Sequence, residues 1–98
     1  MNINIERENG KTLMKIEGRL DTTTAPELEK AISDEGEALK SLVLDFGGVD
    51  YISSAGLRVL LTAQKKMNVQ GIMELNNVSE AVMDIFEMTG FADILVIR

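Results

Sequence analysis

The chain has 98 residues, 45% of them hydrophobic, and its 16 acidic and 10 basic side chains give a formal charge of -6. This length supports one core, so we expect a single domain over residues 1–98, while the acidic balance argues against binding to nucleic acid or to anionic membrane surfaces. Cysteine and histidine are both absent, so we expect no disulfide, no bound metal or cofactor and no enzymatic activity.

The first segment of the chain predicts a β-hairpin. Ile3 and Ile5 alternate with polar residues, residues 13–17 do so in part, and Asn9-Gly10 between them is a tight-turn signal. The N-terminus has neither a basic segment nor a long apolar one, so we expect a cytoplasmic protein without direct membrane insertion.

Helices and strands are expected to alternate after the hairpin. Residues 24–27 have the form of a capping box and predict a first helix that ends at Gly36. The short apolar run at 41–46 predicts a central strand covered on both faces, closed by Asp45. Gly47 and Gly48 are then expected to turn the chain.

The second half of the chain continues this alternation. A second helix is predicted to begin in the serine-rich stretch at 53–56, and a strand follows at 71–75. Asn77 and Glu80 are expected to cap a third helix that stops at Gly90, and residues 94–97 are expected to form the last strand.

The predicted order is therefore ββαβαβαβ, which belongs to the α/β class. Helical crossovers between strands favour a mainly parallel mixed sheet of about five strands, with an N-terminal antiparallel hairpin and three or more helices. In such sheets, sites form where strands end and helices begin. The serine-rich stretch is one of these junctions.

Two interpretations of this junction are open on physical grounds. In the first, Ser53 or Ser54 is an N-cap that accepts a backbone N–H, and Gly56 allows close packing. In the second, Gly56 sacrifices helix propensity to leave a bare surface, so that a large partner can reach a hydroxyl flanked by Ala55 and Gly56. A phosphate added there would meet the positive end of the helix dipole and would be tolerated by the fold.

Three separated segments resemble the STAS domain family, which includes anti-sigma factor antagonists and the tails of sulphate transporters. The sequence Glu-Gly-Arg-Leu-Asp at 17–21, which leads into residues 22–25, resembles the segment before the family's first helix. Residues 42–57 resemble its central strand and phosphoserine loop, and residues 85–91 resemble the end of its third helix.

The resemblance to the antagonist branch implies bacterial signal transduction by partner switching. In that branch the unmodified domain binds an ATP-dependent anti-sigma factor serine kinase and releases a sigma factor. Phosphorylation by the kinase ends the complex, and a phosphoserine phosphatase resets it. Alignment of Gly56-Leu57 with the family's Gly-Leu places the phosphoserine at Ser54. Ser53 stands where the family often has aspartate, and it is a competing phosphosite.

The resemblance also implies a partner-binding surface around the phosphoserine loop. Asp21 matches an aspartate that contributes to partner recognition in the family, although an aspartate between a strand and a helix is also an ordinary turn or cap residue. The expected surface comprises Asp21, Thr22, Ser53, Ser54, Ala55, Gly56 and Arg58.

Other charged and sulfur-containing residues have plainer interpretations. Asp45 is expected to be satisfied by nearby loop N–H groups. Arg58, Lys65 and Lys66 form either a basic strip for an acidic partner or, more commonly, a solvated helix face. The four methionines of the second half are expected in the core; they are Met67, Met73, Met83 and Met88.

Functions of other classes fit the sequence less well than partner switching does. A hydrolase based on Ser53 or Ser54 would need a base, and the available lysines and carboxylates show no recognisable dyad spacing. A small-anion binder would need a glycine-rich phosphate loop that the sequence lacks. The remaining alternative keeps the fold: a stand-alone STAS regulatory subunit of a transporter, a lipid-transport complex or another signalling pathway.

Overall fold

The structure is a computed structural model that describes residues 1–98. Its strands form one sheet in the order β1-β2-β3-β4. The sheet is mixed, because β1 and β2 are antiparallel while β2, β3 and β4 run parallel. The strands are β1 (Asn2–Glu8), β2 (Lys11–Leu20), β3 (Ser41–Ile52) and β4 (Ile72–Asn76), and the helices are α1 (Ala25–Glu35), η1 (Gly36–Ala38), α2 (Ser54–Gln70), α3 (Glu80–Thr89) and η2 (Phe91–Asp93).

The predicted N-terminal hairpin is confirmed. Asn9 and Gly10 have φ angles of 51° and 79°, and such positive values at both central residues are those that a two-residue hairpin turn requires. The turn sets the register in which Ile3 lies opposite Ile16 and Ile5 opposite Met14. The inward-facing side of the hairpin is therefore apolar.

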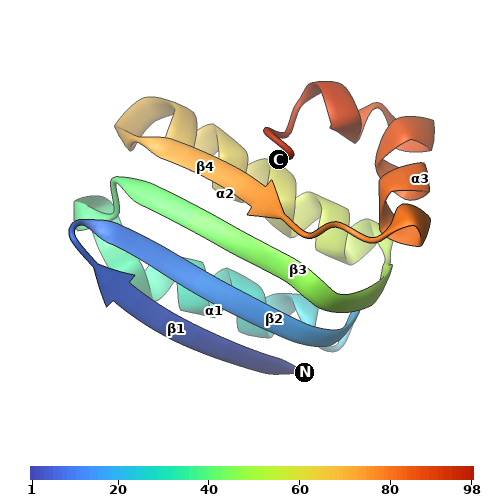
Figure 1. The fold of residues 1–98 in the computed structure, drawn as a ribbon, viewed down its shortest axis with the longest axis horizontal. Coiled ribbons are helices and arrows are strands. Elements are labelled where there is room, and N and C mark those ends of the chain that lie inside the picture. The colour runs from blue at the N-terminus through green and yellow to red at the C-terminus, as the bar shows by residue number, and fades with distance from the viewer.

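The core lies between the sheet and the helices α1 and α2, which cover the same face of the sheet (Figure 1). Leu42, Leu44 and Phe46 of β3 point into this core, whereas Val43 points to the opposite face and is buried outside the core cluster. The strand is buried on both faces at residues 42–44, as predicted, although α1 and α2 cover one face only. The rings of Phe46 and Phe86, with centroids 6.4 Å apart, join α3 to the sheet.

The central strand is longer than predicted. Instead of turning at Gly47-Gly48, β3 continues to Ile52, and Gly48 pairs with Glu17 of β2. A Cβ on Gly48 would lie 2.7 Å from the Cγ of Glu17 and 3.0 Å from the Ile16 carbonyl oxygen. Glycine is needed there because the two strands approach closely at an irregularity in their register, not because the chain turns.

The predicted last strand is absent, so the sheet has four strands instead of about five. After α3 ends at Gly90 in the left-handed conformation, the chain forms the short helix η2. Leu95 is buried, and Ile97 makes one isolated parallel bridge to Leu75 of β4. The apolar run at 94–97 therefore contributes to packing without forming a ladder, because the η2 turn leaves only its end beside β4.

Two details of α3 also differ from the sequence-based prediction. The helix is capped by Ser79, whose Oγ accepts a hydrogen bond from the N–H of Val82 at 3.2 Å, and not by Asn77. Asn77 has a φ of 59° and lies in the connection before the helix. Met88 is 85% exposed, because it lies on the side of α3 opposite the buried Val82 and Phe86; Met67 and Met73 are buried as predicted, and Met83 is half-buried.

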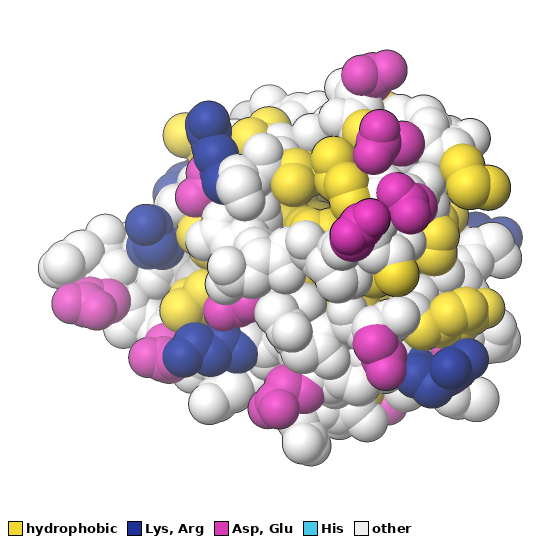
Figure 2. All heavy atoms as spheres, turned by 45° about the vertical axis from the view of Figure 1, so that its right-hand side comes forward, with side chains coloured by type: hydrophobic (Ala, Val, Ile, Leu, Met, Phe, Trp, Pro, Cys, Tyr) yellow, Lys and Arg dark blue, Asp and Glu magenta, His cyan; other side chains and the backbone are white.

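Acidic side chains dominate the exposed surface of α3 and η2. Figure 2 turns the right-hand side of Figure 1 forward and shows acidic groups gathered around hydrophobic side chains. The exposed acidic residues of these two helices are Glu80, Asp84, Glu87 and Asp93. No helix of the structure is both long and apolar enough to cross a membrane.

Candidate functional site

The candidate site is formed by two chain segments at the carboxyl ends of β2 and β3. Since these strands are parallel, their C-terminal ends meet at one edge of the sheet. The first segment, residues 19–24, leads from β2 into α1, and the second, residues 51–56, leads from β3 into α2. The backbone N–H of Ser53 donates to the carbonyl oxygen of Leu20 at 2.9 Å and joins the two segments.

The two serines of the junction differ in accessibility. Ser53 is the N-cap residue of α2, but its side chain makes no capping hydrogen bond, and its Oγ is buried without a partner. Ser54 is the first residue of the helix and is exposed. The N-cap position expected from the sequence is therefore occupied by Ser53, without the side-chain hydrogen bond that usually defines the role.

Gly56 is buried, which contradicts the interpretation that it leaves a bare surface. A Cβ at this position would lie 2.8 Å from a side-chain carbon of Ile52 and 2.8 Å from one of Leu20. The glycine is thus required by close packing of the first turn of α2 against the end of β2.

Ala55 beside Gly56 is half-buried, whereas Arg58 is exposed and forms no ion pair within the chain.

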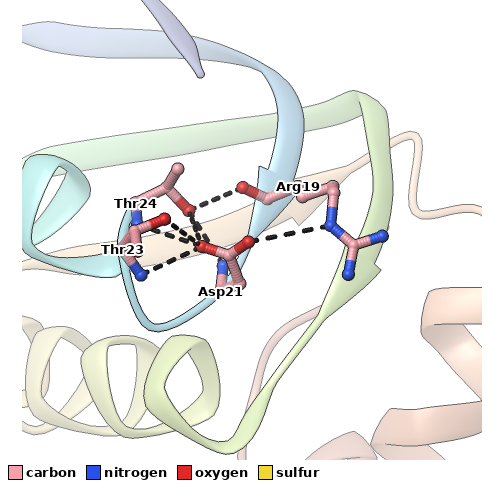
Figure 3. A network of polar contacts seen from close by, with 4 residues as sticks. All are labelled: Arg19, Asp21, Thr23 and Thr24. Atoms are coloured by element: carbon pink, nitrogen blue, oxygen red, sulfur yellow. Dashed lines mark hydrogen bonds and ion pairs between the residues drawn. The ribbon is translucent and has the colours of Figure 1, made fainter.

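Asp21 organises the turn between β2 and α1 (Figure 3). Its Oδ1 accepts hydrogen bonds from the backbone N–H groups of Thr23 at 3.0 Å and Thr24 at 3.1 Å, and from the Thr23 hydroxyl at 2.8 Å. These donors, the Thr23 hydroxyl foremost, lower the pKa of Asp21 to about 2. Asp21 is therefore ionised at neutral pH, and it stabilises the turn, as its position between a strand and a helix suggested. Thr22 is exposed beside it.

The capping box predicted at residues 24–27 does not form. Thr24 is the N-cap residue of α1, but its hydroxyl donates to the Arg19 carbonyl oxygen at 2.6 Å and accepts from the Asp21 N–H at 2.8 Å. The N–H group that a capping hydroxyl would accept, that of Glu27, donates instead to the backbone oxygen of Thr24 at 2.9 Å. Thr24 therefore stabilises the turn instead of the helix end.

Arg19 and Tyr51 belong to the same edge and were not singled out from the sequence. The Cζ of Arg19 lies 4.1 Å from the centroid of the Tyr51 ring, and its Nε lies 3.7 Å from Oδ2 of Asp21. The two residues are paired in the register of β2 and β3. No local sequence signal identifies this contact, because the residues are 32 positions apart and meet only through the strand pairing.

Asp45 lies in β3 and is held by other contacts. Its Oδ1 accepts from the Gly47 N–H at 2.9 Å and from Nδ2 of Asn77 at 3.1 Å. These hydrogen bonds, with that of Gly47 foremost, lower the pKa of Asp45. The carboxylate is satisfied by nearby N–H groups, as expected, but one belongs to the backbone of β3 itself and the other to the side chain of Asn77. Its structural role is to tie β3 to the connection between β4 and α3.

The fold and this edge define a class of α/β domain: a mixed sheet backed by two helices, with an exposed serine at the start of the helix that follows the central strand. The STAS domain family model matches residues 2–98. The chain belongs to the STAS domain family.

Named relatives and solved structures agree with this assignment. The chain is 36% identical over 98 residues to BtrV of Bordetella bronchiseptica, covering 96% of this chain and 83% of that protein. It is 32% identical over 106 positions to the anti-sigma-B factor antagonist of Listeria monocytogenes, covering 100% of this chain and 90% of the relative.

The fold matches those of solved anti-sigma factor antagonists. An antagonist from Mycobacterium paratuberculosis has a TM-score of 0.89 at 23% identity, over 99% of this chain and 84% of that one. The Bacillus cell fate determinant SpoIIAA, in its phosphorylated form, has a TM-score of 0.76 at 18% identity, over 99% of this chain and 91% of that one.

Proposed function

We propose that this protein is an anti-sigma factor antagonist that acts by phosphorylation-controlled partner switching. Its unmodified form binds an anti-sigma factor serine kinase, with ATP held by the kinase, and thereby releases a sigma factor. Phosphorylation of Ser54 ends the complex, and a phosphoserine phosphatase restores the binding form. The domain acts as a regulator without catalysis of its own, in the cytoplasm where sigma factors act.

The observation that carries this proposal is the contrast between the two adjacent serines. A kinase must reach the acceptor oxygen, and Ser54 is exposed while the Oγ of Ser53 is buried. The geometry therefore favours Ser54 over Ser53, which the sequence left as competing sites. The names of the relatives and the existence of a phosphorylated form of SpoIIAA support the same mechanism.

The position of Ser54 also explains how a phosphate could be added without unfolding the domain. A phosphoserine carries about -1.5 to -2 charges at neutral pH. Ser54 is the first residue of α2, where free backbone N–H groups and the positive end of the helix dipole offset negative charge. The same charge would stand near the ionised Asp21 in a desolvated interface, so we expect it to act on binding instead of folding.

Phosphate mapping tests the proposal. The chain is incubated with Mg-ATP and the kinase of the anti-sigma class from the same genome, and intact mass followed by fragmentation locates the phosphate. We expect one phosphate on Ser54, with Ser53→Ala modified normally and Ser54→Ala unmodified. Modification of Ser53 or of residues 22–24 would contradict the assignment.

A capture experiment tests the choice of pathway. The tagged chain is exposed to host lysate with and without ATP, and the retained proteins are identified by mass spectrometry. We expect the kinase to be retained only without ATP. Retention of membrane transport subunits in both conditions would favour the alternative, a stand-alone STAS regulatory subunit.

A further inference from the structure

The guanidinium of Arg19 is an exposed cation whose hydrogen-bonding capacity is unused. Its side chain is 61% exposed, and its nearest anionic atom is Oδ2 of Asp21, 3.7 Å from Nε and beyond hydrogen-bonding distance. The hydrogen bond that joins Arg19 to Thr24 uses the backbone oxygen of Arg19, which accepts from the Thr24 hydroxyl, and leaves the guanidinium out. The five N–H donors of the guanidinium therefore remain free for an external acceptor.

The same guanidinium is held in one orientation. It lies over the Tyr51 ring at 4.1 Å. The Asp21 carboxylate lies beside its Nε (Figure 3). Stacking on an aromatic face and an adjacent carboxylate both restrict the side chain before any partner arrives. A planar guanidinium in a fixed orientation is suited to bidentate binding of a carboxylate, and less of its freedom is lost on binding.

This pair belongs to the edge that carries Ser54. Leu20, which follows Arg19 directly, accepts the hydrogen bond from the Ser53 N–H, and Ile52, which follows Tyr51, pairs with Leu20. Tyr51 is 38% exposed and is the only aromatic residue among the exposed large hydrophobic side chains. Tyrosine and arginine are, with tryptophan, the residue types enriched among the contacts that dominate the affinity of protein interfaces.

We propose that Arg19, stacked on Tyr51, is a specificity-determining contact of the partner-binding surface and binds a carboxylate on the surface of the kinase. This inference rests on the proposed function. It also gives the switch a specific target: a phosphate on Ser54 brings a second anion to this edge, where it repels the carboxylate of the kinase and competes for the guanidinium of Arg19.

Calorimetric titration of the kinase with variants of the full chain, in the absence of ATP, tests the inference. We expect Arg19→Gln to bind at least about tenfold more weakly than the wild type and Arg19→Lys to be intermediate, because lysine keeps the charge but not the planar, stacked donors. Tyr51→Phe should bind normally, since it keeps the ring, and Tyr51→Leu should bind several-fold more weakly. Melting curves of each variant establish that the fold is retained.

Lys40→Gln is the matched control. Lys40 is exposed, forms no ion pair, and lies at the opposite end of β3 from Tyr51, so this substitution makes the same change in net charge away from the site. It should leave affinity unchanged. If it weakens binding as much as Arg19→Gln does, the effect is one of net charge, and the specific role of Arg19 is wrong.

The outcomes separate this inference from the function on which it rests. Wild-type affinity of Arg19→Gln, with normal phosphorylation of Ser54, overturns the role of Arg19 and leaves partner switching intact. If the wild-type chain neither binds the kinase nor is phosphorylated by it, the proposed function fails and the role of Arg19 fails with it.

Discussion

Gly56 and Leu20 are in such close contact that a Cβ on the glycine would lie 2.8 Å from the Cγ of Leu20 and 3.0 Å from its carbonyl oxygen. The start of α2, which carries Ser54, therefore packs directly against the end of β2, which leads to Asp21. This contact and the hydrogen bond from the Ser53 N–H to Leu20 hold the two segments of the candidate site together.

The first prediction concerns Gly56→Ala. Overpacking costs about 1–3 kcal/mol, whereas alanine gains about 1 kcal/mol of helix propensity over glycine. We expect a net loss of about 1 kcal/mol, which lowers the melting temperature by roughly 4–8 °C for a domain of this size. Thr62→Ala, at an exposed position of the same helix, is the control for propensity and should not destabilise the protein. A higher melting temperature for Gly56→Ala would show that the contact is not tight.

The second prediction compares the N-cap residues of α2 and α3. Ser79→Ala should lower the free energy of unfolding by about 1 kcal/mol, because its Oγ accepts a hydrogen bond from Val82. Ser53→Ala should be neutral or slightly stabilising, since it removes a buried hydroxyl that has no partner. Urea denaturation of both variants measures the difference. An equal loss of unfolding free energy in the two variants would mean that the hydroxyl of Ser53 has a hydrogen-bond partner in solution.

The third prediction tests the electrostatic switch. Ser54→Ala should bind the kinase persistently even with ATP, whereas phosphorylated wild type should bind about a hundredfold more weakly than the unmodified form, on the order of 3 kcal/mol. Ser54→Asp adds one charge and should also bind weakly. Both variants should melt within a few degrees of the wild type, because Ser54 is exposed and no hydrogen bond of its side chain is seen. Calorimetric titration measures the affinity for the kinase, and melting curves show whether each variant is folded. A folded Ser54→Asp variant that binds the kinase as tightly as the wild type would contradict the switch.

The fourth prediction concerns an ion pair that joins the hairpin to the end of α1. The Glu35 side chain is only 8% exposed and accepts hydrogen bonds from Nε of Arg7 at 2.9 Å and from the Thr12 hydroxyl at 3.3 Å. These contacts, that of Arg7 foremost, lower the pKa of Glu35. We expect Glu35→Gln to lose about 1–2 kcal/mol at pH 7, because Arg7 keeps access to water when its partner is neutral.

The pH dependence of this effect has a definite sign. Because folding depresses the pKa of Glu35, its contribution is present above the unfolded value of about 4.3 and is lost as the pH falls through the folded value. The difference in unfolding free energy between wild type and Glu35→Gln should therefore shrink between pH 7 and pH 3. Glu29→Gln, at an exposed position of the same helix without an ion pair, should track the wild type. A difference that is constant with pH would mean that the ion pair is not the cause.

Local signals in the sequence were sufficient for most of the fold. The Asn9-Gly10 turn, the apolar stripes of the helices and the glycine at position 90 each depend on neighbours within a few residues, so their consequences could be predicted without the tertiary structure. The spacing of three short segments was likewise sufficient to place the chain in the STAS family and to direct attention to Asp21 and Ser54.

Contacts between distant segments decided what the sequence left open or predicted wrongly. In isolation, Gly48 looks like a turn residue and Gly56 like a bare surface. Each glycine is needed because β2 approaches its backbone, through Glu17 at Gly48 and through Leu20 at Gly56. The apolar run at 94–97 looks like a strand, yet the turn at η2 leaves it one bridge to β4. The tertiary structure also decided the details of the site. The pairing of β2 with β3 stacks Arg19 on Tyr51, and the docking of α2 on the end of β2 buries the Ser53 hydroxyl and leaves Ser54 exposed. Sequence alone could not predict these features, because burial and stacking are properties of surfaces that meet only in the folded chain.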